Sequence, residues 1–177
     1  MNKHQADFWH SPDSDYHLII QPKARMTMTR LCGRASGYEI GGILVGCYST
    51  VRWEKLDSLE CKDLNTAVVM EATPPPKDSV VSHDSFHRGI AGLQKLLAVR
   101  WARPDRQYYL GEWHYHPSWH VEPSDTDIKQ MVQISQAKHY HCSEPIMVIA
   151  GHGNDEALSL RAFVFPHNRD MTELMRQ

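Results

Sequence analysis

The sequence predicts an α+β fold in which a mixed β-sheet is sandwiched between helices. Short apolar runs rich in β-branched residues recur along the chain, as expected for buried strands. Longer stretches with apolar residues at three- and four-residue steps predict helices between some of these runs. Early strands follow one another through short turns, whereas helices separate the later strands. This order favours a three-layer architecture around a mixed sheet.

The size and composition are those of an ordinary globular protein. The chain has 177 residues, of which 41% are hydrophobic and 23% charged, so we expect one domain over residues 1–177. The formal charge of -2 gives no electrostatic reason to expect nucleic acid or a membrane as a partner. No stretch of about 18 apolar residues predicts a membrane span, and the N-terminus lacks an apolar signal sequence. Four cysteines without C-x-x-C spacing predict reduced thiols in a cytoplasmic protein.

The first half of the chain predicts mostly strands. The expected elements are a strand at 16–20, a helix at 22–34, and strands at 38–48, 51–59, 66–72 and 79–82. Pro22 suits a first helical position, and Gly33 marks the end of that helix. Two adjacent glycines, Gly41 and Gly42, lie inside the apolar strand 38–48. Glycines within a strand indicate that another chain segment or a ligand approaches closely.

The second half predicts two long helices among strands. The expected elements are a helix at 86–102, a strand at 107–115, a helix at 124–139, and strands at 145–150 and 158–165. Apolar residues from Ile90 to Trp101 recur at three- and four-residue steps, which is the basis for the first helix. The strand at 107–115 brings His114 and His116 to its C-terminal end.

Two histidines and an aspartate form a candidate metal site. His114 and His116 are two residues apart, and side chains two apart in a strand point to the same face. Neutral imidazole is a common zinc ligand. Asp127 becomes a third ligand if the loop 117–123 folds the next helix back over the strand end. Three protein ligands leave one position open for water, which is typical of a catalytic zinc ion, here one per chain.

The same residues allow other interpretations. Ser124-x-x-Asp127 is also the pattern of a capping box, with Ser124 as the N-cap and Asp127 in the first helical turn. A single His-x-His pair often has no metal. The combination within one window favours the metal site, and Ser124 can serve both functions, because its hydroxyl can face the open metal position while its backbone starts the helix.

A hydrolytic site also needs a general base. Glu39 is the candidate, because it begins a buried, glycine-rich strand, where a carboxylate is costly without a partner. Glu112 is a weaker candidate for the base, since strand alternation places it on the same face as His114.

Together these residues resemble the JAMM metalloprotease motif of JAB/MPN domains. The resemblance rests on Glu39 before a Gly-Gly strand, then His114-x-His116-Pro117, six residues, and Ser124-x-x-Asp127. It implies a cytidine deaminase-like three-layer fold and a zinc-dependent isopeptidase. In such an enzyme His114, His116 and Asp127 would hold zinc, Glu39 would act as base and then acid, and Ser124 would stabilise the oxyanion. Inactive MPN scaffolds typically lack these ligands.

Gly111-Glu112-Trp113 before the histidines is most similar to bacterial JAB proteins encoded with E1- and E2-like enzymes. These include the deconjugases of type II CBASS antiphage operons, whose substrate is a nucleotidyltransferase joined by its C-terminal tail to a target. The resemblance thus implies a protein conjugate as substrate, with E1/E2-like enzymes and a nucleotidyltransferase as partners. Two alternatives stay open: a deubiquitinase-like enzyme of another ubiquitin-like operon, and a non-catalytic MPN interaction module. A RadC-type protein fits less well, since Trp119 follows Ser118 where that branch usually has glycine.

Overall fold

The computed structural model describes residues 5–13, 15–54, 61–118, 120–152 and 158–177. Its regular elements are, in chain order, β1 Asp7–His10, β2 His17–Ile20, α1 Pro22–Cys32, β3 Ile40–Glu54, β4 Cys61–Ala72, β5 Val80–Val81, β6 Phe86–His87, α2 Leu93–Trp101, β7 Tyr108–His116, α3 Asp125–Gln136, β8 Ile146–His152, β9 Leu158–Val164 and β10 Thr172–Arg176. A 3-10 turn, Lys138–Tyr140, follows α3. Among the described residues, no helix is both long and apolar enough to cross a membrane.

One mixed sheet organises the protein. Its strand order is β1-β10-β9-β8-β7-β3-β4-β2, and it closes because β1 also pairs with β2. The pairs β2–β4 and β7–β8 are parallel and the others antiparallel. The α+β class and the mixed sheet are therefore confirmed, and the sheet curves until its edges meet.

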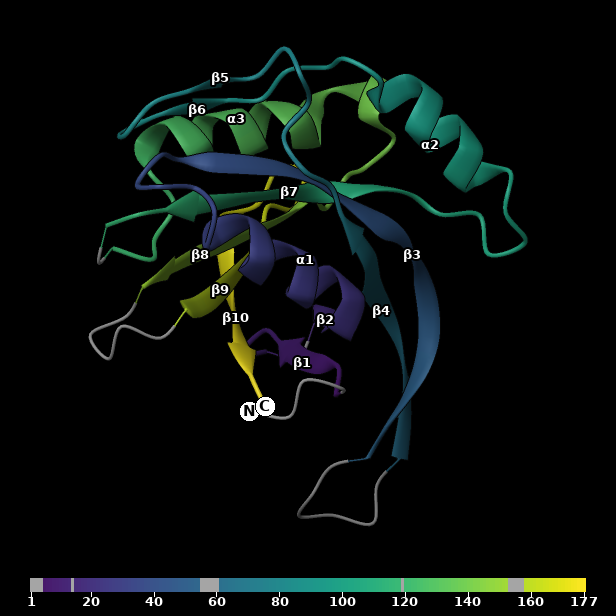
Figure 1. Ribbon diagram of the computed structural model, residues 1–177. Coiled ribbons are helices and arrows are strands. Elements are labelled where there is room, and N and C mark those ends of the chain that lie inside the picture. The colour runs from purple at the N-terminus through teal and green to yellow at the C-terminus, as the bar shows by residue number, and fades with distance from the viewer. Residues whose placement is uncertain (1–4, 14, 55–60, 119, 153–157) are drawn as a thin grey trace.

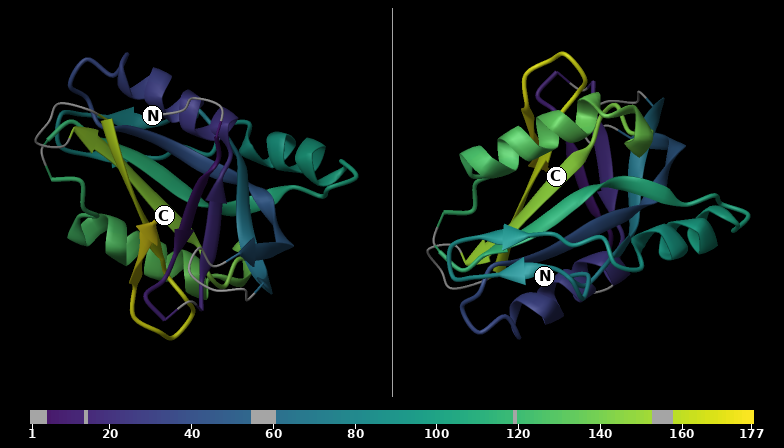
Figure 2. Two further views of the ribbon diagram at one scale, coloured as in Figure 1. Left: turned by 90° about the horizontal axis from the view of Figure 1, so that it is seen from below. Right: turned by 90° about the horizontal axis from the view of Figure 1, so that it is seen from above.

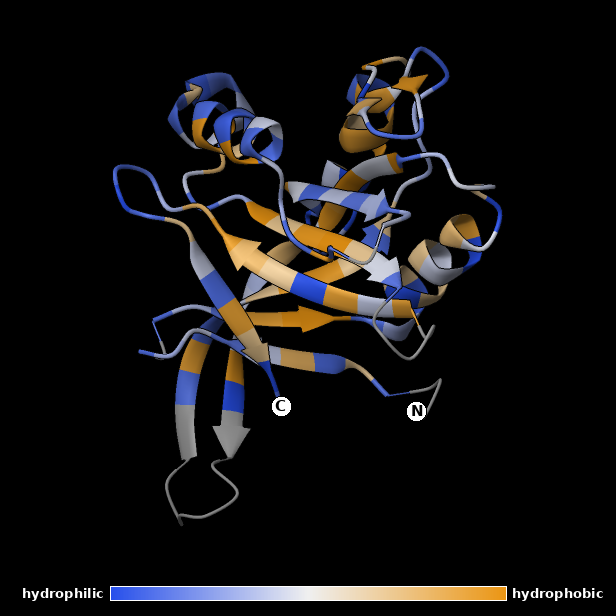
Figure 3. Ribbon diagram, turned by 90° about the vertical axis from the view of Figure 1, so that its left-hand side faces the viewer, coloured by the Kyte–Doolittle hydropathy of each residue, from blue (hydrophilic) through white to orange (hydrophobic). Residues whose placement is uncertain are grey.

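Helices cover both faces of the sheet. Figure 1 shows α1 on one side of β7, and α2, α3 and the β5–β6 hairpin on the other. Each face has its own apolar cluster. The cluster on the α1 side includes Leu18, Met28, Leu44, Trp113 and Val148, and the cluster on the α3 side includes Ile43, Tyr109, Met131, Ile149 and Phe163. In Figure 3 the central strands are mostly hydrophobic, whereas the β3–β4 hairpin becomes hydrophilic away from them.

Most of the predicted elements are present, but β3 runs further than expected. The predicted strands at 38–48 and 51–59 are one strand as far as Glu54, because Ser49 and Thr50 continue the ladder to β4. Residues 55–59, the end of the second predicted strand, lie outside the described part of the chain. The sequence prediction also missed β1 and β10, which pair with each other.

The predicted helix over 86–102 is wrong in its first half. Phe86 and His87 form β6, and the helix begins only at Leu93. Gly92 has a φ of 80°, which interrupts a helix. The Asp78 carboxylate also accepts hydrogen bonds from the backbone N–H groups of Ile90 and Ala91, and these hold a turn there. Periodicity cannot reveal this long-range contact.

Candidate metal centre

Strand β7 presents different side chains to its two sides. Trp113 and Tyr115 belong to the cluster on the α1 side. Glu112, His114 and His116 alternate with them and are all buried on the α3 side. The sequence prediction that the two histidines share a face is confirmed. Seen from above, α3 and the β5–β6 hairpin lie on either side of this strand (Figure 2).

A bulge in β7 sets which residues reach the site. Leu44 pairs with Gly111 and Val45 with Tyr109, so Leu110 is an extra residue without its own partner in β3. Gly111 has a φ of 149°, and a Cβ there would overlap the carbonyl oxygen of Ile146. Glycine is therefore required, and the bulge places Tyr109 on the same face as Glu112.

Gly41 and Gly42 allow other chain segments to approach β3 closely, as the two glycines in the sequence predicted. A Cβ on Gly41 would lie 2.7 Å from both the His114 ring and the Phe86 ring. A Cβ on Gly42 would overlap Thr73, whose carbonyl oxygen accepts a hydrogen bond from the Trp113 indole at 2.9 Å. The glycines thus make room for the residues around β7.

Ser124 and Asp127 form the start of α3. The Ser124 backbone N–H donates to Asp127 Oδ2 at 2.8 Å, and the Asp127 N–H donates to Ser124 Oγ at 3.2 Å. This is the capping box that the sequence allowed. The Ser124 hydroxyl also donates to Asp127 Oδ2 at 2.7 Å. The cap fixes the Asp127 carboxylate, whose other oxygen faces His114.

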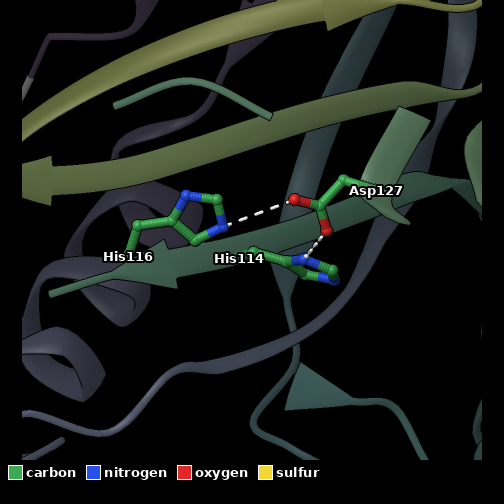
Figure 4. Close-up of side chains that lie close together, drawn as sticks. All are labelled: His114, His116 and Asp127. Atoms are coloured by element: carbon green, nitrogen blue, oxygen red, sulfur yellow. Dashed lines mark hydrogen bonds and ion pairs between the residues drawn. The ribbon is translucent and has the colours of Figure 1, made fainter. Parts of the chain in front are cut away.

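The cap brings Asp127 to both histidines (Figure 4). His114 Nδ1 lies 2.8 Å from Asp127 Oδ1, and His116 Nε2 lies 3.5 Å from Asp127 Oδ2. Ligand atoms from the three side chains lie within 4.8 Å of one another, and all three residues are buried. Two imidazole nitrogens and one carboxylate oxygen are a donor set that zinc prefers, and such a set leaves a fourth position open. These residues therefore fit a zinc ion.

The pKa values of His114 and Asp127 are shifted because these side chains lie close to one another and to other charged groups. Burial lowers the pKa of His114, but the Asp127 and Glu112 carboxylates outweigh this effect and raise the pKa to about 9. Burial alone would raise the pKa of Asp127. Hydrogen bonds from His114, His116 and Ser124 reverse that effect and lower its pKa well below the usual range.

Glu39 lies immediately before β3, next to the cluster. Ile40 pairs with Tyr115, so continuing the register by one residue places Glu39 opposite His116. The Glu39 backbone N–H donates to the Ser82 carbonyl at 2.8 Å, which joins it to the β5–β6 hairpin. Burial raises the pKa of the Glu39 carboxyl; the Asp127 carboxylate raises it further, while His116 and His114 oppose the increase. A raised pKa makes a half-buried carboxylate a better proton acceptor, as a general base requires.

Glu112 has a different environment from the one expected of a base. Its side chain is fully buried, and Arg88 Nε donates to Oε1 at 2.8 Å. Gln130 Nε2 donates to Oε2 at 3.0 Å, and the Tyr109 hydroxyl donates to Oε1 at 3.3 Å. With both oxygens engaged, Glu112 is not placed to accept a proton from a substrate water. The interpretation of Glu112 as a competing base therefore receives no support from these contacts.

Sequence reasoning did not identify Arg88, Gln130 or Phe86 as neighbours of the site. Arg88 and Gln130 bind Glu112, and the Phe86 ring contacts the His114 ring edge-on, with centroids 5.2 Å apart. Arg88 and Phe86 lie in a segment that was predicted as helix, and a helix gives no indication that their side chains point toward β7. For Gln130 a signal existed, because it follows Asp127 by three residues and so shares its helix face.

Comparison with known proteins gives three results. Residues 22–164 match the sequence profile of a family described as prokaryotic homologs of the JAB domain. Over 151 residues the chain is 38% identical to a protein of Enterobacter hormaechei subsp. hoffmannii named CD-NTase/cGAS isopeptidase, covering 85% of this chain and 76% of that protein. The solution structure of a protein from Desulfitobacterium hafniense aligns with a TM-score of 0.49 and 16% identity, covering 87% of each chain.

Proposed function

The chain belongs to the prokaryotic JAB family, and on this premise we propose that it is a zinc-dependent isopeptidase of the JAMM type. Its reaction would be hydrolysis of the amide bond that joins the C-terminal tail of one protein to a target protein. The observation that carries the proposal is the group of His114, His116 and Asp127 ligand atoms within 4.8 Å of one another, with the Glu39 carboxyl beside them. The proposal treats residues 1–177 as one JAB domain, which is supported by a single sheet that includes both β1 and β10.

His114, His116 and Asp127 would hold the metal. The chemistry that bound zinc supplies is polarisation of a carbonyl group and acidification of water. The protein contributes rigidity to this ligand set. His114 and His116 are on a strand paired with neighbours on both sides, and Asp127 is held by its own capping box. Rigid placement of ligands on strands and helices is what a metal site of defined geometry needs.

Glu39 would move the proton. It would accept a proton from the attacking water as the new carbon–oxygen bond forms at the scissile carbonyl. As the carbon–nitrogen bond breaks, Glu39 would return the proton to the departing lysine amine, so the proton count balances. Its raised pKa, caused first by burial, matches a group that carries a proton in both directions.

Ser124 would stabilise the negative charge that develops on the carbonyl oxygen. Its side chain is exposed, and its hydroxyl lies 2.7 Å from Asp127 Oδ2. A hydroxyl donor held at the edge of a metal site can turn toward an oxyanion, and one such donor typically contributes about a hundred- to a thousandfold in rate. Ser124 would then serve as both helix cap and oxyanion donor.

The substrate that we propose is a nucleotidyltransferase conjugated through its C-terminal tail. The support is the 38% identity to the Enterobacter hormaechei protein whose name specifies a CD-NTase/cGAS isopeptidase. An extended tail could bind by strand addition, with main-chain hydrogen bonds giving affinity. E1- and E2-like enzymes would form the conjugate, and the setting would be antiphage defence in the cytoplasm. The second candidate is a deconjugase of a ubiquitin-like protein, which has the same chemistry.

Two matched conjugates test the substrate. One carries the C-terminal tail of a nucleotidyltransferase joined to a lysine side chain, and the other carries a ubiquitin-like tail on the same lysine. We expect faster cleavage of the first conjugate and release of a free tail carboxylate, identified by intact mass. Faster cleavage of the second would support the alternative substrate, and cleavage of neither by zinc-loaded protein would reject the isopeptidase proposal.

A non-catalytic interaction module makes a different prediction for Asp127→Ala. Such a module would bind its partner unchanged, and the wild-type protein would leave the conjugate intact. An isopeptidase would lose both zinc and cleavage in the same variant. Zinc content, partner binding and cleavage measured on the two proteins therefore separate the two functions.

A further inference from the structure

A buried cluster of hydrogen-bond donors surrounds Glu112 behind the candidate metal site. The side chain of Glu112 is fully buried. Arg88 and Tyr109 donate to its Oε1, and Gln130 donates to its Oε2. Its Oε2 also lies 3.6 Å from His114 Nε2. A carboxylate, which has only acceptors, matches this environment, whereas an amide would direct a donor toward other donors.

This cluster is not explained by stability alone. Replacing a buried ion pair by apolar residues of similar volume is often neutral or stabilising, so a fold has little need of Glu112 and Arg88 in that position. The strand already has a large apolar cluster on its other face. A buried carboxylate next to a candidate metal ligand therefore calls for a functional explanation, and the position of His114 supplies one.

The His114 ring has a fixed orientation. It packs against Gly41, where even a Cβ would come within 2.7 Å of its Cδ2 atom, and against the edge of Phe86. Its Nδ1 atom lies 2.8 Å from Asp127 Oδ1, on the side of the other two ligands. Its Nε2 atom is buried without a hydrogen bond, and Glu112 Oε2 lies 3.6 Å away from it.

Both nitrogens of the ring face a carboxylate, Nδ1 that of Asp127 at 2.8 Å and Nε2 that of Glu112 at 3.6 Å. A neutral imidazole has one N–H and one lone pair. When a metal takes the place of a proton on Nδ1, an N–H on Nε2 is attracted to Glu112, whereas a lone pair there would be repelled. Resting on the proposed zinc function, we infer that Glu112 is a positioning residue. It holds the Nε2–H tautomer of His114, so that Nδ1 presents its lone pair to the metal together with His116 and Asp127.

Gln130 and Arg88 extend this role. Gln130 lies on α3 three residues after Asp127, so its bond to Glu112 links the helix that carries one ligand to the strand that carries the other two. Arg88 also donates to the Tyr140 hydroxyl at 3.2 Å and to the Gly89 carbonyl at 3.0 Å. Glu112 thus fixes both the proton on His114 and the spacing between β7 and α3. Carboxylates that accept from a ligating histidine are a recurrent means of setting metal affinity.

The test compares Glu112→Gln with Glu71→Gln. Glu71 lies on another strand, β4, and accepts two hydrogen bonds from Arg100, of 2.8 and 3.1 Å, so its variant removes an arginine–carboxylate pair outside β7. Zinc affinity is measured by competition with a chromophoric chelator. We expect roughly ten- to a hundredfold weaker zinc binding for Glu112→Gln, and no change for Glu71→Gln. Glu112→Asp, which keeps the charge, should fall between Glu112→Gln and the wild type.

A second measurement needs no variant. In the zinc-loaded wild-type protein, long-range 1H–15N spectra of the histidine rings show which nitrogen binds the metal. We expect His114 to bind through Nδ1 and to keep a proton on Nε2. Ligation through Nε2, or unchanged zinc affinity in folded Glu112→Gln, would overturn this inference and leave the isopeptidase proposal intact. Wild-type protein that binds no zinc would instead reject the proposed function itself.

Discussion

The two faces of β7 are both buried, but one carries apolar side chains and the other carries polar ones. Toward α1, Trp113 and Tyr115 pack among apolar residues, and the one polar atom of Trp113 donates to a backbone carbonyl. Toward α3, Glu112, His114 and His116 bury polar groups, and His114 Nε2 has no hydrogen bond. Burial of polar groups costs free energy unless they are paired. The side chains of β7 that face α1 therefore contribute stability, whereas those that face α3 form the candidate site.

The largest expected effect is on catalysis. Glu39→Gln removes the proposed proton carrier, so we expect cleavage to fall by about 10²- to 10⁴-fold while zinc content stays the same. Initial rates on a tail conjugate, together with metal analysis of the same sample, measure both quantities. Cleavage at the wild-type rate would mean that another residue moves the proton.

The next effect is on stability and concerns the apolar face. Trp113→Ala removes a fully buried ring and its hydrogen bond to Thr73, so it should lower the free energy of unfolding by about 3–5 kcal/mol. Urea denaturation of metal-free protein measures this change without a contribution from zinc. Val99→Ala on α2 is the control, because that side chain is 52% exposed and its loss should cost less than about 0.5 kcal/mol. A comparable cost for both variants would contradict the assignment of stability to the α1 face.

Some features of the two faces could be predicted from the sequence and others could not. The alternation of side chains in β7 could be predicted, because strand periodicity and the His-x-His pair are local features of the sequence. The candidate ligands His114, His116 and Asp127 were also local to one window. The partners of Glu112 were not readable, since Arg88 and Gln130 lie 24 and 18 residues away in sequence and meet it only through the fold. The β6 strand and the late start of α2 were missed for the same reason, because Asp78 stabilises the intervening turn from a distance.

Ser124→Ala distinguishes the helix-capping role of Ser124 from its proposed role as an oxyanion donor. Loss of the helix cap should cost about 1 kcal/mol of stability. Loss of the proposed oxyanion donor should lower cleavage by about 10²- to 10³-fold, well beyond what the loss of the cap explains. Denaturation and rate measurements are compared at a temperature where the variant stays folded. A normal rate in a slightly destabilised variant would leave Ser124 as a helix cap alone.

The smallest expected effect is a difference in reaction rate between two thiols, one on each face. Burial raises the pKa of Cys32, in the α1 cluster, to about 12 and that of Cys142, in the α3 cluster, to about 11. Both thiols should therefore stay protonated at pH 8 and react slowly with iodoacetamide. Cys142 also lines a cavity of about 880 Å³ beside α2, so it should react before Cys32. Peptide mapping by mass spectrometry measures the two rates.

The same raised pKa values set a pH dependence of stability. An unfolded thiol loses its proton near pH 8.5, whereas the folded thiols keep theirs to higher pH. Their contribution to stability is thus intact below about pH 8.5 and is lost as the pH rises toward 11. Cys142→Ser should reduce this loss, and urea denaturation at pH 8 and pH 10 checks it. An unchanged dependence would show that other groups cause it.

Zinc titration of the metal-free protein tests the central claim most directly. Initial rates of conjugate cleavage are measured while zinc is added in known equivalents, with Asp127→Ala as the matched protein. We predict no cleavage before zinc is added, a linear rise to a plateau at one zinc per chain, and no response from Asp127→Ala. Full cleavage by metal-free protein, or an equal response from Asp127→Ala, would contradict the assignment of His114, His116 and Asp127 as the catalytic zinc site.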